Sequence, residues 1–319
     1  MSDITKLEFG NKSDVGQKRK ANEDYFGSFK GEYGSLFIVC DGMGGYKGGR
    51  TASTTAVETI KNHFSSVKAD ANMRTELYQA LKKADAEIVK KAQEDPELGR
   101  MGTTAVIALI QGSQLFIAHI GDSRAYRVRD EEIERLTRDH SFVEELVASA
   151  VITPEQAENH PKKNVILRSL GPNGDSEPEV DARDEVLFKD DIIVLCSDGL
   201  TGHVDDKEIR DIVLKNNPVK ACEELVALAN NRGGNDNITV QVIKVAEGKK
   251  RALSLKQQAM VKQLYGTVTA IILVIILWFI LANNSKIAVI QKDNDSKGTP
   301  TDSTGTTSGS DKPDSGGQK

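Results

Sequence analysis

The chain has 319 residues, with 28% charged and 38% hydrophobic side chains and a formal net charge of −5 at pH 7. This composition is typical of a globular body, and the acidic balance argues against general nucleic-acid binding, which needs a basic surface. The three cysteines, Cys40, Cys196 and Cys222, contain no Cys-x-x-Cys pair, so the sequence predicts neither a disulfide framework nor a zinc ribbon. We interpret them as small buried hydrophobic residues in a reducing compartment.

In the first half of the chain, apolar runs and helical spacing alternate. Residues 36–40 form an apolar run that ends at Asp41-Gly42, which fits a buried strand bounded by a turn. Residues 50–65 and 73–93 are predicted to be helices, the second with apolar residues at helical spacing. Residues 103–110 and 114–120 are strand-like and joined by a short polar turn, which predicts a hairpin.

The second half repeats the pattern. Residues 121–124 form a turn into a strand at 125–128, and residues 141–150 are predicted to be helical. A further short helix begins with Thr153 as its cap and Pro154 at its first position. Residues 192–196 form a second buried strand, ending at Asp198-Gly199, before a helix at 218–230 and a strand at 238–242. Strands joined by tight turns favour antiparallel sheets with helices outside them, and we predict one domain over residues 1–246.

The C-terminal part differs in composition. Residues 247–263 are predicted to be a basic juxtamembrane linker, and residues 264–282 contain no charged side chain. A helix of that length spans about 28 Å, close to the ~30 Å hydrocarbon core of a bilayer, so we predict a transmembrane helix. Because the basic flank lies on its N-terminal side, the body is expected to face the cytoplasm of a single-pass cell-membrane protein. Residues 283–319 are polar and predicted to be a disordered extracytoplasmic tail.

Acidic clusters follow or precede the apolar strands of the body. They are Asn22-Glu23-Asp24, Asp41-Gly42, Gly121-Asp122-Ser123, Ser197-Asp198-Gly199 and Asn235-Asp236-Asn237. Each alone is an ordinary turn sequence, but together they would line the rim of a buried sheet. Carboxylates and carbonyls suit hard cations such as Mg²⁺ or Mn²⁺, and two such ions can activate water for attack on phosphorus. Arg19, near the first cluster, has a planar fork that matches two phosphate oxygens.

These motifs, in this order, together with Met101-Gly102-Thr103-Thr104 and the Gly16–Asp24 segment, resemble the bacterial metal-dependent (PPM, type 2C) protein serine/threonine phosphatases. The resemblance covers about residues 8–246. It implies an α+β fold, an αββα sandwich of two packed antiparallel sheets flanked by helices. It also implies hydrolysis of phosphoserine and phosphothreonine by a water that bridges two Mn²⁺ or Mg²⁺ ions, which would reverse serine/threonine kinase signalling.

The resemblance implies a role for each motif residue. Asp41 would bridge both metals, the Gly42 carbonyl would bind one, and Asp198 and Asp236 would bind the other. Glu23 and Asp24 would hold metal-bound waters, and Arg19 would bind the substrate phosphate. Bacterial members often bind a third metal, for which Asp122 and Asp198 are the matching ligands; Asn159 stands near another third-site position and is a poorer ligand than a carboxylate.

One position departs from the pattern of some eukaryotic relatives, which carry a histidine proposed as general acid. Here that residue is Met43, which has no proton to donate, and a metal-bound water is the preferred substitute. His140 and His160 lie in a stretch expected to form a flap beside the site, and we interpret both as structural or surface residues.

Two other functions remain as alternatives. A catalytically inactive pseudophosphatase would use the same fold as a membrane-tethered phosphoprotein-binding module, although all the ligand positions are intact. A phosphate-loop nucleotide hydrolase is suggested by the glycine-rich residues 41–50, but these lack the Gly-Lys-Ser/Thr ending which that loop requires. The expected partners are phosphorylated proteins, including a membrane serine/threonine kinase and its substrates.

Overall fold

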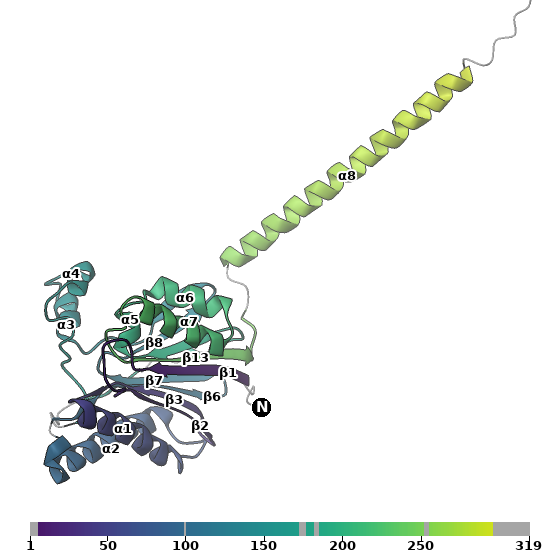
Figure 1. The fold of residues 1–319 in the computed structure, drawn as a ribbon. Helices are drawn as coiled ribbons and strands as arrows, with labels where there is room; N and C mark the ends of the chain where they lie inside the picture. The colour runs from purple at the N-terminus through teal and green to yellow at the C-terminus, as the bar shows by residue number, and fades with distance from the viewer. Residues whose placement is uncertain (1–5, 99, 172–176, 182–184, 252–254, 296–319) are drawn as a thin grey trace, which may run out of the picture. The chain divides into compact units, whose positions relative to one another are not determined.

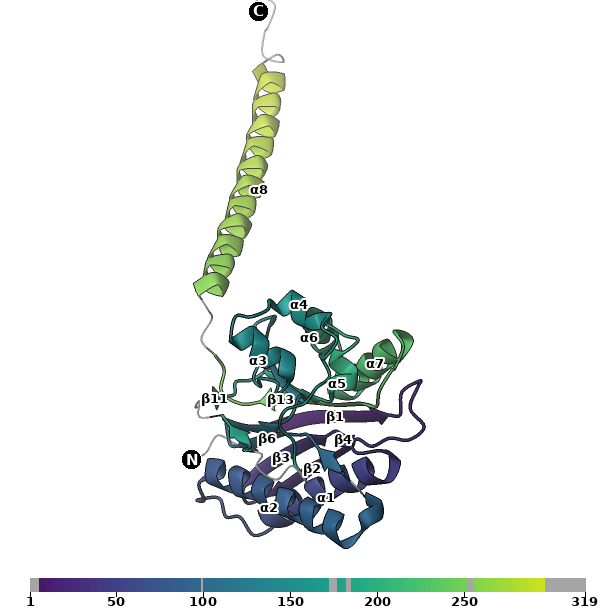
Figure 2. The same cartoon turned by 90° about the vertical axis from the view of Figure 1, so that its left-hand side faces the viewer.

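The structure is a computed structural model that describes residues 6–98, 100–171, 177–181, 185–251 and 255–295. The chain divides into two compact units, residues 1–251 and residues 252–319. Figures 1 and 2 show the first unit as a layered body and the second as one long helix. The two units are described separately.

Two antiparallel sheets form the centre of the body (Figure 1). In order across the first sheet, the strands are β1 (Lys6–Asp14), β13 (Ile238–Glu247), β12 (Ile192–Cys196), β8 (Arg124–Arg129) and β9 (Glu132–Arg135). In order across the second sheet, they are β10 (Glu179–Val180), β7 (Gln114–Ile120), β6 (Ala105–Gln111), β3 (Gly34–Cys40) and β2 (Tyr25–Gly31), with β11 (Glu185–Val186) also pairing with β7. The short strands β4 (Gly42–Met43) and β5 (Gly102–Thr103) pair with each other beside the second sheet.

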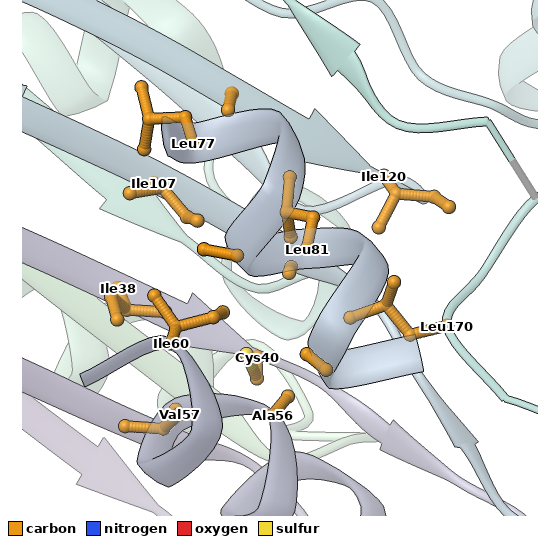
Figure 3. Close-up of a cluster of buried hydrophobic side chains, with 14 of the residues drawn as sticks. Ile38, Cys40, Ala56, Val57, Ile60, Leu77, Leu81, Ile107, Ile120 and Leu170 are labelled. Carbon is orange, nitrogen blue, oxygen red and sulfur yellow. The ribbon is translucent and has the colours of Figure 1, made fainter. Parts of the chain in front are cut away.

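The central strands are buried on both faces, because alternate side chains point to opposite sides of a strand. On β3, Phe37 and Val39 join the cluster between the two sheets. Ile38 and Cys40 point the other way and join the cluster under the helices. Figure 3 shows this second cluster, with side chains from β3 packed against side chains from two helices. This double coverage explains why the strand reads as a continuous apolar run.

Helices cover the outer face of each sheet (Figure 2). The second sheet is covered by α1 (Tyr46–Phe64) and α2 (Met73–Glu94), and α2 begins where the Asn72 side chain accepts hydrogen bonds from the first-turn N–H groups. The first sheet is covered by α5 (Asp198–Thr201), α6 (Asp206–Lys215) and α7 (Pro218–Asn231). The predicted αββα sandwich is therefore confirmed.

Several elements differ in extent from the prediction. Helix α1 begins at Tyr46, four residues before the predicted start. The predicted strand at residues 103–110 is two strands, since β5 ends at Thr103 and β6 begins at Ala105. β1, β2 and β9 were not predicted, because their sequences are largely polar or lack a clear alternation. α6 was also not predicted, although Ile209 and Val213 stand at helical spacing and Asp205 forms a capping box with Glu208.

A small subdomain lies between β9 and β10 and corresponds to the expected flap. It contains α3 (Phe142–Ala148) and α4 (Pro154–Glu158), neither of which has a buried residue. Ser141 pairs with Ile166 where the two ends of this segment meet. Elsewhere in the body, a one-turn 3₁₀ helix, Pro96–Leu98, follows α2 directly in the chain.

The second unit contains α8 (Leu255–Asp295). This helix is longer than the predicted transmembrane segment: it includes residues 255–263 of the predicted linker and residues 283–295 of the predicted disordered tail. Polar ends do not prevent a helix from continuing beyond its apolar stretch, since residues such as Lys, Gln and Ala propagate helices well. Residues 296–319 of the tail lie outside the described residues.

Candidate metal centre

Antiparallel pairing brings the acidic clusters to one end of both sheets. In the second sheet Tyr25 pairs with Cys40, so Asp24, which precedes β2, lies beside Asp41, which follows β3. In the first sheet Cys196 pairs with both Val240 and Arg124, which places the end of β12 next to the start of β13 and of β8. Asp198 follows the end of β12, Asp236 precedes the start of β13, and Asp122 precedes the start of β8.

The carboxyl groups are close enough to act on one another. The charges of Asp24, Asp198, Asp122 and Asp236 all act on Asp41, and the charge of Asp236 also acts on Asp198. The structure therefore collects residues that lie far apart in the sequence into one acidic pocket, which we define by Glu23, Asp24, Asp41, Asp122, Asp198 and Asp236.

Proton affinities in the acidic pocket are high. Burial, reinforced by the neighbouring carboxylates, raises the pKa of Asp24 to about 7 and that of Asp122 to about 8. Burial and the same neighbours also raise the pKa of Asp41 well above its ordinary value, and that of Asp198 is raised as well. Crowded buried carboxylates cannot all ionise without a compensating positive charge.

The carboxylates fit divalent metal ions. Among the described residues, Asp24 Oδ1, Asp122 Oδ1 and Asp198 Oδ1 are buried and have no hydrogen-bond partner. Buried polar atoms are normally satisfied, and oxygen atoms that share a pocket without donors are the ligands that Mg²⁺ and Mn²⁺ prefer.

The backbone at Gly42, whose carbonyl is a predicted metal ligand, is also closely packed. A Cβ at residue 42 would lie 2.2 Å from the Gly49 carbonyl oxygen and 2.5 Å from that of Glu23, so only glycine allows the backbone this approach.

Hydroxyl and amide side chains make hydrogen bonds that fix the acidic residues and their backbone. The Ser197 hydroxyl donates to Asp24 Oδ2 at 2.8 Å, and the backbone N–H of Asp41 donates to the Thr104 hydroxyl at 3.0 Å. The Asn237 side chain accepts from the Glu23 N–H and donates to the carbonyls of residues 15 and 21. Sequence reasoning missed these supporting roles, because Ser, Thr and Asn beside glycine are also ordinary turn residues.

The remaining predicted residues lie as follows. Arg19 is exposed, and its guanidinium pairs with Asp236 at 2.6 Å, so it borders the acidic pocket. Met43 lies in β4 and pairs with Gly102. Asn159 is the C-terminal cap of α4, and His160 lies beside the Phe142 ring with 5.8 Å between ring centres, so both belong to the flap. His140 is buried next to Gly121.

A cavity found among the described residues lies elsewhere. It has a volume of about 630 Å³ and lies between the ends of α1 and α2, where His63, Glu76 and Lys83 line it. None of the acidic residues named above lines it. The volume of this cavity therefore does not indicate where the candidate metal centre lies. The unpartnered carboxylate oxygens that lie close together do indicate it.

Known proteins share this fold and sequence. A family model described as Protein phosphatase 2C matches residues 16–241. The protein phosphatase PhpP of Streptococcus pneumoniae is 38% identical over 238 residues, which cover 74% of this chain and 96% of that protein. The crystal structure of serine/threonine phosphatase Stp1 from Staphylococcus aureus matches with a TM-score of 0.71 and 36% identity, covering 78% of this chain and 98% of that one.

A further solved structure is the catalytic domain of the serine/threonine protein phosphatase PstP in complex with two manganese ions. It matches with a TM-score of 0.67 and 32% identity, covering 76% of this chain and 99% of that one. The family match spans most of the chain and includes every residue of the acidic pocket. The resemblance drawn from the motifs is confirmed, and the chain belongs to the protein phosphatase 2C family.

Proposed function

We propose that the body of this protein is a metal-dependent phosphatase that hydrolyses phosphoserine and phosphothreonine in proteins. The observation that carries the proposal is the acidic pocket, whose buried oxygens lack partners and lie beside an exposed arginine. The relatives PhpP and Stp1 are named as protein and serine/threonine phosphatases, which supports the same substrate class.

Two Mn²⁺ or Mg²⁺ ions are the proposed cofactors. Asp41 and the Gly42 carbonyl would hold them together with Asp198 and Asp236, and Glu23 and Asp24 would hold their water ligands. A third ion would be held by Asp122 and Asp198. When bound, such ions would neutralise the charge of the phosphate. They would also lower the pKa of the water that they hold, so that hydroxide is available as a nucleophile at neutral pH.

The protein's own residues would bind and orient the substrate. The guanidinium of Arg19 presents two parallel N–H donors that match two phosphate oxygens. Since Met43 has no proton to donate, a water molecule in the pocket would protonate the leaving serine or threonine oxygen. The Thr104 hydroxyl and the Asn237 amide keep the backbone of Asp41 and Glu23 in place, which preserves the orientation of the carboxylates.

The test uses the purified full chain with a phosphothreonine peptide. We expect phosphate release that depends on Mn²⁺ or Mg²⁺ and stops with a chelator, and no comparable release from ATP. Folded protein that binds the peptide without releasing phosphate would support the pseudophosphatase alternative instead. Phosphate release from ATP alone would favour a nucleotide hydrolase.

We also propose that α8 anchors the body to the cell membrane with the body on the cytoplasmic side. Among the described residues, Lys262–Leu281 is the segment long and apolar enough to cross a bilayer, and its side chains are exposed. The basic residues before it favour this orientation. Phosphoproteins at the membrane, including a serine/threonine kinase, are then the proposed substrates.

Cell fractionation and protease digestion of intact cells test this placement. We expect the protein in the membrane fraction, with its body protected from protease added outside. Recovery in the soluble fraction, or digestion of the body from outside, would contradict it.

A further inference from the structure

A second group of metal-binding side chains lies outside the acidic pocket. His119 on β7, His140 after β9 and Glu179 on β10 each offer a ligand atom, and these atoms lie within 4.8 Å of one another. The two imidazole rings stack with 4.7 Å between their centres and 26° between their planes. Their lone pairs lie in the ring planes, so nearly parallel rings do not direct them at one point.

Hydrogen bonds also argue against a metal at this second group. The backbone N–H of Gly121 donates to His140 Nδ1 at 3.2 Å, so the proton of the neutral ring belongs on Nε2, which faces Glu179 Oε2 at 3.4 Å. A metal ion on Nε2 would move that proton to Nδ1, where the Gly121 N–H already points. Burial lowers the pKa of His140 to about 4, and the nearby His119 adds to this, so the ring is neutral near pH 7.

His140 instead binds both backbone groups of one residue. Its own N–H donates to the Gly121 carbonyl at 2.9 Å, while its ring nitrogen accepts the Gly121 N–H. Gly121 has φ +99°, and a Cβ there would lie 2.6 Å from Thr104 Cγ2, so this peptide is tightly confined. The next residue is Asp122, which is buried and has an unpartnered Oδ1.

His140 is itself held from several sides. Its carbonyl accepts the N–H of Leu167, at the point where the flap rejoins the body. His119 stacks on its ring and is fixed in turn by a 2.8 Å contact between its Nε2 and the Arg138 carbonyl. Glu179 lies directly across from His119 in the pairing of β10 with β7. A side chain held in this way can fix the direction of a neighbouring residue.

We infer that His140 is a positioning residue: by bonding both backbone groups of Gly121, it directs the Asp122 carboxylate into the acidic pocket and sets the affinity for the divalent ion that Asp122 holds. The inference rests on the proposed metal sites and concerns a residue that does not touch the ion. Side chains that orient metal ligands typically change metal affinity by about 10- to 100-fold when they are replaced.

Two substitutions at this position differ in one hydrogen bond. His140→Asn places an amide oxygen near Nδ1 and can still accept from Gly121, whereas His140→Gln places its amide near Nε2 and cannot. Mn²⁺ binding to the metal-free full chain is measured by calorimetry, and Asp122→Asn identifies the binding step that belongs to Asp122. We expect this step to weaken by about 10-fold or more in His140→Gln and to stay close to wild type in His140→Asn.

Two further measurements complete the test. His140→Gln added to Asp122→Asn should cause no additional loss, because the two changes act on one site. Glu179→Gln, which changes the cluster but leaves the Gly121 hydrogen bonds, should bind Mn²⁺ as wild type does. Equal losses in His140→Asn and His140→Gln, or wild-type binding in His140→Gln, would overturn the inference.

If His140→Gln does not fold, hydrogen exchange of the Gly121 amide in the metal-free wild-type protein decides the matter. Slow exchange supports its hydrogen bond to His140, and exchange as fast as in an exposed loop refutes it. Both readouts are independent of turnover. A wild-type protein that binds Mn²⁺ as expected but releases no phosphate would refute the proposed function while leaving this inference standing.

Discussion

Arg19 and Asp236 form an ion pair in which Nη2 of the arginine lies 2.6 Å from Oδ2 of the aspartate. The other carboxylate oxygen accepts the backbone N–H of Asn237 at 2.8 Å. The proposed roles of the two side chains differ, since Arg19 would bind phosphate and Asp236 would hold a metal ion. Because the same carboxylate interacts with the arginine, phosphate affinity and metal binding are linked through this pair.

The first prediction concerns phosphate binding by the metal-free protein. Asp236→Asn removes the charge that pairs with Arg19, so the guanidinium becomes more available to inorganic phosphate. An exposed ion pair contributes up to about 1 kcal/mol, so we expect phosphate to bind up to about fivefold more tightly. Calorimetry in the presence of a chelator measures this change.

Glu23→Gln is the matched control, since Glu23 also acts on Arg19 through its charge. It should raise phosphate affinity less than Asp236→Asn does. The gain from Asp236→Asn should disappear when Arg19→Ala is already present. A gain of the same size in that background would show that general electrostatics, and not the ion pair, is responsible.

The second prediction concerns two central aspartates. Asp41→Asn and Asp198→Asn should each lower kcat/KM by at least about 100-fold, or about 2.7 kcal/mol of transition-state stabilisation. The metal-free variants should be at least as stable as the wild type, since burial and neighbouring carboxylates raise the pKa of both residues. Phosphopeptide assays and thermal unfolding in a chelator measure the two effects.

Glu87→Gln, an exposed change on α2, serves as the control and should alter neither quantity. Wild-type turnover by either folded aspartate variant would be incompatible with the proposed roles. Unfolding of both variants would instead assign these aspartates to the stability of the body.

The sequence predicted the strands that are buried on both faces, because their apolar runs are unambiguous. It failed for β1, where only Gly10 is buried among residues of mixed character. That strand is positioned by its neighbours: it pairs with β13 along its whole length, and a Cβ on Gly10 would lie 2.6 Å from the backbone of Pro218 in α7. Contacts between segments so far apart in the chain leave no local pattern.

The candidate site shows the same division. Asp-Gly at the end of an apolar strand was a usable signal for Asp41 and Asp198. The Ser197 hydroxyl, by contrast, reaches Asp24 across a separation of 173 residues, and nothing near either residue predicts that contact. His140 was interpreted as a structural or surface residue, and only the hydrogen bonds to Gly121 indicate what its ring holds in place.

The third prediction concerns pH and metal release. Burial raises the pKa of Asp24 to about 7 and that of Asp122 to about 8, so below these values metal ions must displace protons. Mn²⁺ affinity should therefore rise between pH 6 and about pH 8. Calorimetry in two buffers with different ionisation enthalpies should show proton release at pH 6.5 and much less at pH 8.5.

The same pKa shifts set the sign for stability of the metal-free body. As pH rises above about 4, the aspartates of the unfolded chain lose their protons while the folded state retains them, so the raised pKa values lower stability progressively up to about pH 8. Stabilisation by added Mn²⁺ should grow over the same interval. Equal Mn²⁺ affinity at pH 6 and pH 8.5, without proton release, would contradict both expectations.

The fourth prediction concerns Asp85, a buried carboxylate on α2. It accepts the N–H of Gly171 at 2.7 Å, and the adjacent Leu170 exchanges two backbone hydrogen bonds with Thr103 at 3.0 and 2.9 Å. The Thr103 hydroxyl then donates to the Asp41 carbonyl at 2.8 Å. Asp85 is therefore connected to the acidic pocket through three successive contacts.

Asp85→Ala should destabilise the body by about 1–3 kcal/mol, because the buried N–H of Gly171 loses its acceptor. Asp85→Asn keeps an acceptor and, since burial raises the pKa of Asp85, should be close to wild type in stability. If Asp85 also positions Asp41, kcat/KM at a temperature where both variants are folded should fall in Asp85→Ala and be restored in Asp85→Asn. Denaturant unfolding and phosphopeptide assays separate the two effects: equal behaviour of the variants would show that the hydrogen bond to Gly171 is dispensable, and a loss of stability with unchanged kcat/KM would confine Asp85 to packing.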